Sequence, residues 1–305
     1  MSAVWVLLFS SSLWGLTWWP LKQFAGYGLS GPMLAMLTYG FAGLVGLPAL
    51  WAQRAQWRSH TGLLVLIALV GGWGNTAFVS ALVLGDVVRV MLLFYLAPVW
   101  SVLGGRFLLG ERVSRRRAGA VALSLAGAFL VVGGTAAFAA PPSAADLMAI
   151  TAGMAFSGNN ILARKAQGVP AISKTVGLLL GCGLTSALML VVLSSTSSTA
   201  PVVWPLAAFT LPITVGLILF SLLWMVLVTF TWQWSVTRLE AGRSGVIAIA
   251  ELVVALMSVT LLGHETMTLL ECLGAALIGA AAILEATDNP TPPAAPPPSI
   301  APQPT

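Results

Sequence analysis

The sequence predicts an all-α integral membrane protein of ten transmembrane helices, arranged as two inverted five-helix repeats. The prediction rests on a scarcity of charge, a strongly apolar composition and the spacing of long apolar stretches. Of 305 residues, 14 are Lys or Arg, 9 are Asp or Glu, and 58% are apolar. A soluble domain carries about 25% charged residues, because its surface faces water. The 8% charged residues and the mean hydropathy of +0.95 exclude a soluble enzyme, a nucleic-acid-binding protein and a disordered protein.

Each predicted span is a stretch of roughly 20 mostly apolar residues, the length that a membrane-crossing helix needs. The first span is expected to be retained, because no basic residue precedes it and no small-residue cleavage site follows it. Ser143 with Asp146 and Thr268 with Glu271 form capping-box patterns at the starts of the sixth and tenth spans. The ten spans are 3–21, 32–52, 62–84, 87–108, 116–134, 144–166, 173–193, 208–234, 244–262 and 269–286.

Basic residues predict the orientation, because cytoplasmic loops carry an excess of Lys and Arg. If both termini are cytoplasmic, 12 of the 14 basic residues flank cytoplasmic loops, and only Lys22 and Arg89 lie outside. We therefore expect a multi-pass inner-membrane protein with both termini in the cytoplasm. The net charge of +5 then needs no acidic partner. The 12 residues are Arg54, Arg58, Arg106, Arg112, Arg115, Arg116, Arg117, Arg164, Lys165, Lys174, Arg238 and Arg243.

Several motifs are missing from the sequence. Cys182 and Cys272 fall in apolar stretches, so neither a disulfide framework nor a metal site is expected. None of the three lysines lies in a phosphate-binding Gly-rich loop, and no Gly-x-Ser-x-Gly nucleophile elbow occurs. We expect no enzymatic activity, no cofactor and no nucleic-acid partner. Residues 289–305 hold eight prolines and no charge, which predicts a disordered cytoplasmic tail.

An internal repeat divides the chain into halves at 1–137 and 138–288. A shift of 154 residues aligns Asp86 with Glu240, Arg89 with Arg243, and Glu111 with Glu265. Five spans in each half place the second half upside down relative to the first. Secondary transporters are built from inverted repeats of this kind, with the substrate site near the midplane between them.

The sequence resembles the EamA-type members of the drug/metabolite transporter superfamily. The resemblance lies in Leu13-Trp14-Gly15, in the stretch from Asn75 to Gly110-Glu111, and in the stretch from Glu240 to Gly263-His264-Glu265 with the Gly274 helix. The first half is most similar to the YddG-type exporters of aromatic amino acids. The resemblance implies two inverted five-helix repeats around a cavity lined by spans one, three, four, six, eight and nine, with spans five and ten at the periphery.

Three positions are expected to act as hinges: Gly15, Pro98 and Gly158. Pro98 predicts a kink in span four, because proline removes a helical hydrogen bond. Many members of the family carry a Glu-Pro pair in the second half, where this chain has Glu251-Leu252. The sequence therefore predicts no proline kink in span nine.

Glu251 is the one acid well inside a predicted span, about eight residues or roughly 12 Å from the cytoplasmic end of its helix. A carboxylate at that depth costs on the order of 2.5 kcal/mol unless it is protonated, paired or facing water. Glu251 is therefore either a proton-coupling group, a contact for a substrate ammonium, or a protonated acid that ties two helices together.

Amides and aromatic residues complete the expected site. Asn75, Asn159 and Asn160 either bind substrate or form hydrogen bonds between closely packed helices. Aromatic side chains either line the cavity or belong to interface belts and helix packing. The candidate aromatic lining residues are Trp14, Trp18, Phe78, Tyr95, Trp100 and Trp224.

The remaining charges have structural interpretations. Arg89 and Asp86 are three residues apart on one helix and are expected to pair, with attraction of a substrate carboxylate as the alternative. Glu111 and Glu265 follow glycine-containing turns and are expected to cap helices.

We therefore expect a monomeric secondary transporter that exports small neutral or aromatic amino acids, or related metabolites, by alternating access. A multidrug or other metabolite exporter of the same fold is the first alternative. A membrane-embedded enzyme or structural membrane protein is the second.

Overall fold

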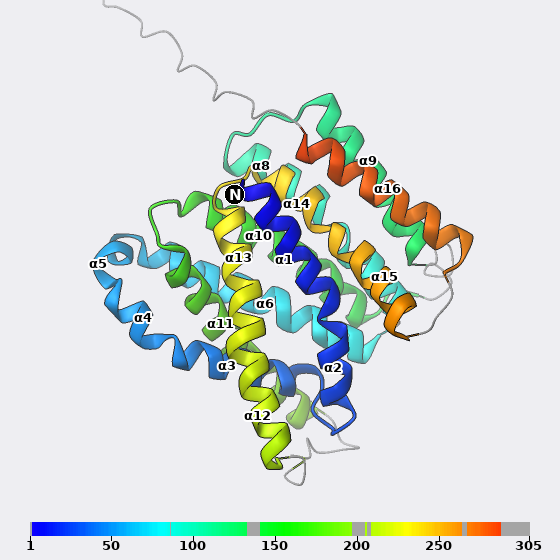
Figure 1. Ribbon diagram of the computed structural model, residues 1–305. Coiled ribbons are helices and arrows are strands. Elements are labelled where there is room, and N and C mark those ends of the chain that lie inside the picture. The colour runs from blue at the N-terminus through cyan, green and yellow to red at the C-terminus, as the bar shows by residue number, and fades with distance from the viewer. Residues whose placement is uncertain are drawn as a thin grey trace, which may run out of the picture.

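A computed structural model of the chain describes residues 2–85, 87–132, 141–196, 205, 209–263 and 267–287 (Figure 1). Within these ranges the secondary structure is helical and contains no strand, which confirms the predicted all-α class. Asp86, His264, Glu265 and the tail 289–305 lie outside the described residues. Six described stretches are long and apolar enough to cross a membrane. They are Arg54–Leu84, Arg89–Leu108, Ala171–Ser195, Leu211–Val236, Ala241–Leu262 and Leu269–Ala286.

Helices of the first half occupy the predicted spans, and three of these spans are interrupted. The first is interrupted at Thr17, the second at Gly46, and the fourth at residues 95–96, just before Pro98. The helices are α1 (Ala3–Leu16), α2 (Trp18–Ala25), α3 (Gly31–Val45), α4 (Leu47–Ala52), α5 (Arg54–Trp57), α6 (Thr61–Leu84), α7 (Val87–Phe94), α8 (Ala97–Leu108) and α9 (Arg115–Val131).

Helices of the second half also follow the predicted spans. The predicted capping boxes are present at Ser143 and Thr268. Span eight contains a π-helix, Phe220–Met225, and span nine is interrupted at Ile249 without a proline. The helices are α10 (Ala144–Lys165), α11 (Ala171–Thr196), α12 (Leu211–Leu219), α13 (Val226–Val236), α14 (Ala241–Ala248), α15 (Ala250–Gly263) and α16 (Leu269–Ala286).

Helices α9 and α16 pack side by side at one edge of the bundle, where glycines bring their backbones together (Figure 1). A Cβ added at Gly127 would lie 2.6 Å from the carbonyl oxygen of Gly274, and one at Gly274 would lie 2.6 Å from that of Gly127. Arg117, near the start of α9, contacts Glu285, near the end of α16, so the two helices run antiparallel.

Other helix pairs also meet at small residues. Gly40 of α3 faces Gly183 of α11, and Ser101 of α8 faces Gly245 of α14. Gly46, at the end of α3, meets Val176, near the start of α11, so these helices run antiparallel. Helices α8 and α14 are likewise antiparallel, because Gly105 near the end of α8 meets Ala241 at the start of α14. Small residues at such contacts allow the close backbone approach on which helix packing in lipid depends.

Charged side chains cluster at the end of the bundle that carries the starts of α9 and α14. Arg117 is buried and pairs with both Glu240 and Glu285, at 2.9 Å from the carboxylate of Glu285. Glu111 accepts hydrogen bonds from the backbone N–H of Ala241 at 2.9 and 3.0 Å. Glu111 therefore caps α14, a helix of the other half of the chain. At the opposite end, Arg89 pairs with Asp146 at 2.9 Å.

Replacing Gly127 by Ala is expected to destabilise the contact between α9 and α16. The added methyl group would overlap the Gly274 carbonyl and Ile278, which lie 2.6 and 2.7 Å from it. Overpacking of this kind costs about 1–3 kcal/mol. The matched control is Gly119→Ala on the same helix, where a Cβ meets nothing within 4 Å. Unfolding midpoints in detergent should fall for G127A and stay level or rise for G119A. Equal midpoints would contradict the packing role.

Replacing Glu111 by Gln is expected to leave the bundle at least as stable at neutral pH. Burial raises the pKa of the Glu111 carboxyl, and hydrogen bonds from the backbone N–H of Ala241 and Gly242 oppose this only in part. Because the folded-state pKa lies above the unfolded one, stability from Glu111 is fully present below the unfolded pKa of about 4.3 and declines as the pH rises through the folded pKa.

The advantage of E111Q should therefore shrink when unfolding midpoints are measured at about pH 4 instead of pH 7. Glu111→Ala is the control, because it removes the acceptor for Ala241 and should cost about 0.5–2 kcal/mol at about pH 4, with a smaller cost at pH 7. An E111Q variant as unstable as E111A at neutral pH would show that the negative charge itself is required.

Candidate functional site

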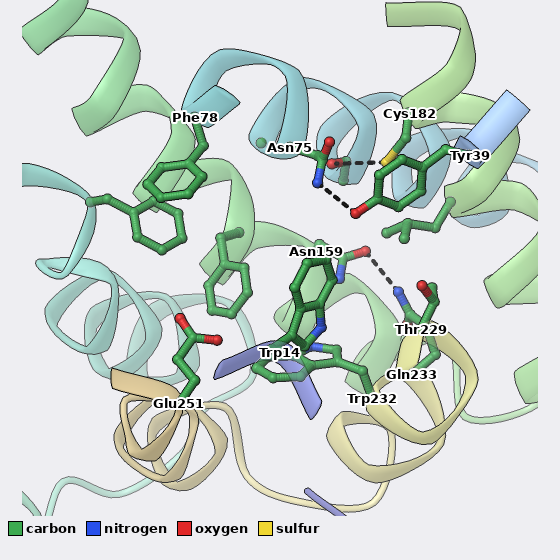
Figure 2. A pocket seen from close by; sticks show the side chains of 15 residues that line it. Trp14, Tyr39, Asn75, Phe78, Asn159, Cys182, Thr229, Trp232, Gln233 and Glu251 are labelled. Atoms are coloured by element: carbon green, nitrogen blue, oxygen red, sulfur yellow. Dashed lines mark hydrogen bonds between the residues drawn. The ribbon is translucent and has the colours of Figure 1, made fainter. Parts of the chain in front are cut away.

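A cavity lies in the centre of the bundle and is lined by residues from both halves of the chain (Figure 2). Its volume is about 130 Å³. The lining residues are Trp14, Tyr39, Gly71, Gly74, Asn75, Phe78, Phe94, Phe156, Asn159, Leu178, Cys182, Thr229, Trp232, Gln233 and Glu251.

Aromatic rings form one continuous wall of the cavity. Phe78 and Phe94 have ring centroids 4.3 Å apart, Phe94 and Phe156 are 5.6 Å apart, and Phe156 and Trp232 are 5.2 Å apart. The chain of contacts links α6, α7, α10 and α13. Such a wall provides an apolar surface and π-faces for a ligand that carries an apolar or aromatic group.

Polar side chains from four helices face the aromatic wall. Asn75 of α6 donates to the hydroxyl of Tyr39 of α3 at 2.9 Å, and Gln233 of α13 donates to the side-chain oxygen of Asn159 of α10 at 3.2 Å. Three buried oxygens have no hydrogen-bond partner among the described residues. They are the side-chain amide oxygens of Asn75 and Gln233 and the hydroxyl oxygen of Thr229. A buried polar atom left unpaired costs about 1–3 kcal/mol, and each of these three oxygens can accept a hydrogen bond.

Glu251 is the one acid in the lining, and it lies across the cavity from Asn75 and Tyr39 (Figure 2). It occupies the first turn of α15, directly after the interruption at Ile249. Its carboxylate accepts a hydrogen bond from Tyr95 at 3.4 Å. Among the described residues, no Lys or Arg forms an ion pair with Glu251.

Five of the residues predicted for substrate binding line the cavity: Trp14, Asn75, Phe78, Asn159 and Glu251. Five others lie outside its lining. Tyr95 donates a hydrogen bond to Glu251 at 3.4 Å, and Asn160 accepts a hydrogen bond from the indole of Trp232 at 3.0 Å.

The other three are tryptophans. The indole N–H of Trp18 donates to Ser258 at 2.8 Å, and that of Trp224 donates to Thr17 at 2.9 Å. Trp100 lies on α8, and its indole nitrogen has no hydrogen-bond partner among the described residues. The indoles of Trp18 and Trp224 therefore face helix contacts rather than the cavity.

The expected hinge residues differ in their surroundings. Pro98 follows the interruption of span four at residues 95–96 and lies in the first turn of α8. Gly15 lies where α1 packs closely against the backbone of α15. Gly158 lies inside α10, which continues without interruption from Ala144 to Lys165. The backbone is therefore not opened at Gly158.

The lining includes residues that the sequence analysis did not select. Tyr39 belongs to span two and Cys182 to span seven, so the cavity reaches two spans beyond those implied by the family resemblance. Gln233 was also missed, although it is the one glutamine within a predicted span. The rule that selected the asparagines, an amide inside an apolar stretch, would have selected it.

Comparisons with known proteins connect this geometry to a family. Residues 1–133 match the model of the EamA-like transporter family. A comparison with curated proteins finds no match.

One solved crystal structure of a protein is similar over 92% of this chain and 94% of that chain, with a TM-score of 0.74 and 21% sequence identity. At this identity the similarity establishes a shared fold, which extends well beyond the matched N-terminal domain.

Proposed function

We propose that the chain is a secondary transporter that exports small neutral amino acids, aromatic ones among them, across the inner membrane by alternating access. The observation that carries the proposal is the central cavity, in which an aromatic wall faces unpaired acceptors and a single carboxylate. Both halves of the chain contribute to it, and residues 1–133 match the EamA-like transporter family.

The proposed architecture has two inverted repeats, 1–137 and 138–288, followed by the tail 289–305. Its support is that three pairs of corresponding spans pack antiparallel: α3 with α11, α8 with α14, and α9 with α16. The interruptions at Tyr95 and Ile249 are separated by the same 154 residues that align the charges of the two halves. An inverted pair of this kind puts the substrate site near the membrane midplane.

The proposed orientation places the charge cluster around Arg117 in the cytoplasm. The ends of α8, α10 and α13 carry Arg106, Arg164 and Arg238, and the starts of α9 and α14 carry Arg117 and Arg243. An excess of basic residues marks the cytoplasmic side. We propose that the protein works in the inner membrane as a monomer, with both termini in the cytoplasm.

The proposed substrate class follows from the lining and from the resemblance to YddG-type exporters. The orphan oxygens of Asn75 and Gln233 are acceptors, and Glu251 adds negative charge, so this part of the cavity suits an ammonium group. The aromatic wall suits the apolar side chain of the same molecule. The same acceptors and rings also fit an apolar cation through cation–π contacts, which makes an exporter of such cations the second candidate.

Counter-flow in liposomes tests the function. Purified protein should exchange labelled phenylalanine and tryptophan, and Trp14→Ala should reduce the rate about tenfold through loss of about 1.4 kcal/mol of binding. Trp5→Ala is the matched control on the same helix, because Trp5 is 65% exposed on the outer face and does not line the cavity. Flux of tetraphenylphosphonium without amino-acid exchange would favour the second candidate. Absence of flux with either compound would overturn the transport proposal.

Glu251→Gln tests the role of the carboxylate. If Glu251 couples transport to protons, the variant should still exchange substrate but lose its response to a pH gradient, so that rates with and without the gradient become equal. Tyr95→Phe is the control, because it removes the hydrogen bond to Glu251 and leaves the carboxylate in place. An E251Q variant with unchanged rate and unchanged pH dependence would leave Glu251 only a structural role.

A further inference from the structure

A second pocket lies at the basic end of the bundle, where α10 and α11 pack near the end of α13. Its volume is about 520 Å³, and it shares no lining residue with the central cavity. Three of its lining residues are basic, namely Arg164, Lys174 and Arg238, and none is acidic. The pocket therefore concentrates positive charge at a place that the proposed transport cycle does not use.

Lys174 is fully buried at the base of this pocket. Its ammonium donates to the carbonyl oxygens of Ala163 and Ala166 at 3.2 and 3.0 Å, and to the hydroxyl of Thr237 at 2.7 Å. All three acceptors are neutral. The ammonium is held by three hydrogen bonds without a counter-charge, so its field remains available to an anion in the pocket.

The two arginines retain donors for such an anion. Arg164 donates to the carbonyl oxygen of Thr237 at 3.1 Å, and Arg238 donates to that of Trp234 at 2.9 Å while it stacks on the Trp234 ring. A guanidinium has five N–H donors in a fixed fork. Within the part of the chain that the structure describes, no carboxylate forms an ion pair with Arg164, Lys174 or Arg238.

The start of α11 adds to the positive potential. This helix begins at Ala171, a lining residue of the pocket, and is 26 residues long. The first N–H groups of a helix have no intrahelical acceptor, and the helix dipole places partial positive charge at the same point. Helix starts of this kind bind phosphate groups.

We propose that this pocket binds a phosphate group, carried by the headgroup of an anionic lipid or by free phosphate. Arg164 and Arg238 make the direct contacts, because their planar forks match phosphate oxygens. Lys174 and the start of α11 supply the field. Basic pockets between transmembrane helices on the cytoplasmic side bind anionic lipid headgroups, and the proposed orientation puts this pocket on that side.

The test compares the double variant Arg164→Gln/Arg238→Gln with the wild type. Thermal unfolding of the full chain in neutral detergent is followed while phosphatidylglycerol, phosphatidylcholine or inorganic phosphate is titrated, with chloride holding the ionic strength constant. A ligand that binds the folded state raises the midpoint. The apparent affinity for phosphatidylglycerol or phosphate is expected to be at least about tenfold weaker in the double variant, a change of about 1.4 kcal/mol.

The matched control is Arg115→Gln/Lys165→Gln, which removes the same charge from exposed positions at the same end of the bundle. It should bind within about twofold of the wild type, because long-range charge alone is screened over about 10 Å at 0.1 M salt. A response to phosphatidylglycerol alone identifies a lipid site, and a response to inorganic phosphate identifies a free-phosphate site. Equal loss in both double variants, or no response in the wild type, would overturn the proposal.

The charge-preserving variant Arg164→Lys/Arg238→Lys serves if the Gln variant does not fold. It keeps the net charge but loses both planar forks. Weaker binding in the Lys variant at an unchanged midpoint without ligand would support the proposal, and wild-type affinity would contradict it.

Discussion

The structure depends on the close approach of helix backbones at glycines. Lipid tails are as apolar as leucine, so the hydrophobic effect does not drive helices together in a bilayer. Van der Waals packing between the helices has to stabilise their association instead. Gly127 with Gly274, and Gly40 with Gly183, bring helices of the two halves into direct backbone contact. Gly72 of α6 likewise packs against Gly181 of α11. These contacts set the spacing between the helices, and Phe78, Phe94 and Phe156 line the central cavity.

The interruptions of the helices are constrained by the bilayer as well, because backbone N–H and C=O groups away from water need hydrogen-bond partners. In lipid, irregular backbone is tolerated only where it is buried in protein or lines a cavity. The interruption at Ile249 produces the start of α15, and Glu251 lies in its first turn. The interruption at residues 95–96 places Tyr95 within hydrogen-bond reach of that carboxylate. The carboxyl group of Glu251 and the tyrosine that bonds to it therefore come from two interrupted helices, one in each half.

Composition and apolar spacing were sufficient to predict the fold class, because lipid imposes its constraint on nearly every residue of a span. They also indicated Asn75, Asn159 and Glu251, since a polar side chain within an apolar stretch stands out. They could not separate Trp14, which lines the cavity, from Trp18 and Trp224, whose indoles bond to Ser258 and Thr17. Whether an aromatic side chain faces the cavity depends on how its helix is rotated about its own axis. In a span that is apolar on all sides, the order of apolar and polar residues does not indicate that rotation. Tyr39 and Trp232 were missed for the same reason.

The two halves are joined by ion pairs at both ends of the bundle. At the basic end, Arg117 of the first half pairs with Glu240 and Glu285 of the second. At the other end, Arg89 of the first half pairs with Asp146 of the second. Parting the halves at either end would separate these partners and lose their attraction and hydrogen bonds. Alternating access, as proposed here, would part the halves at one end at a time, and each opening would have to solvate the pair at that end. The closed state at either end is thereby favoured over a state open at both, which is the condition that a transporter must meet to avoid acting as a channel.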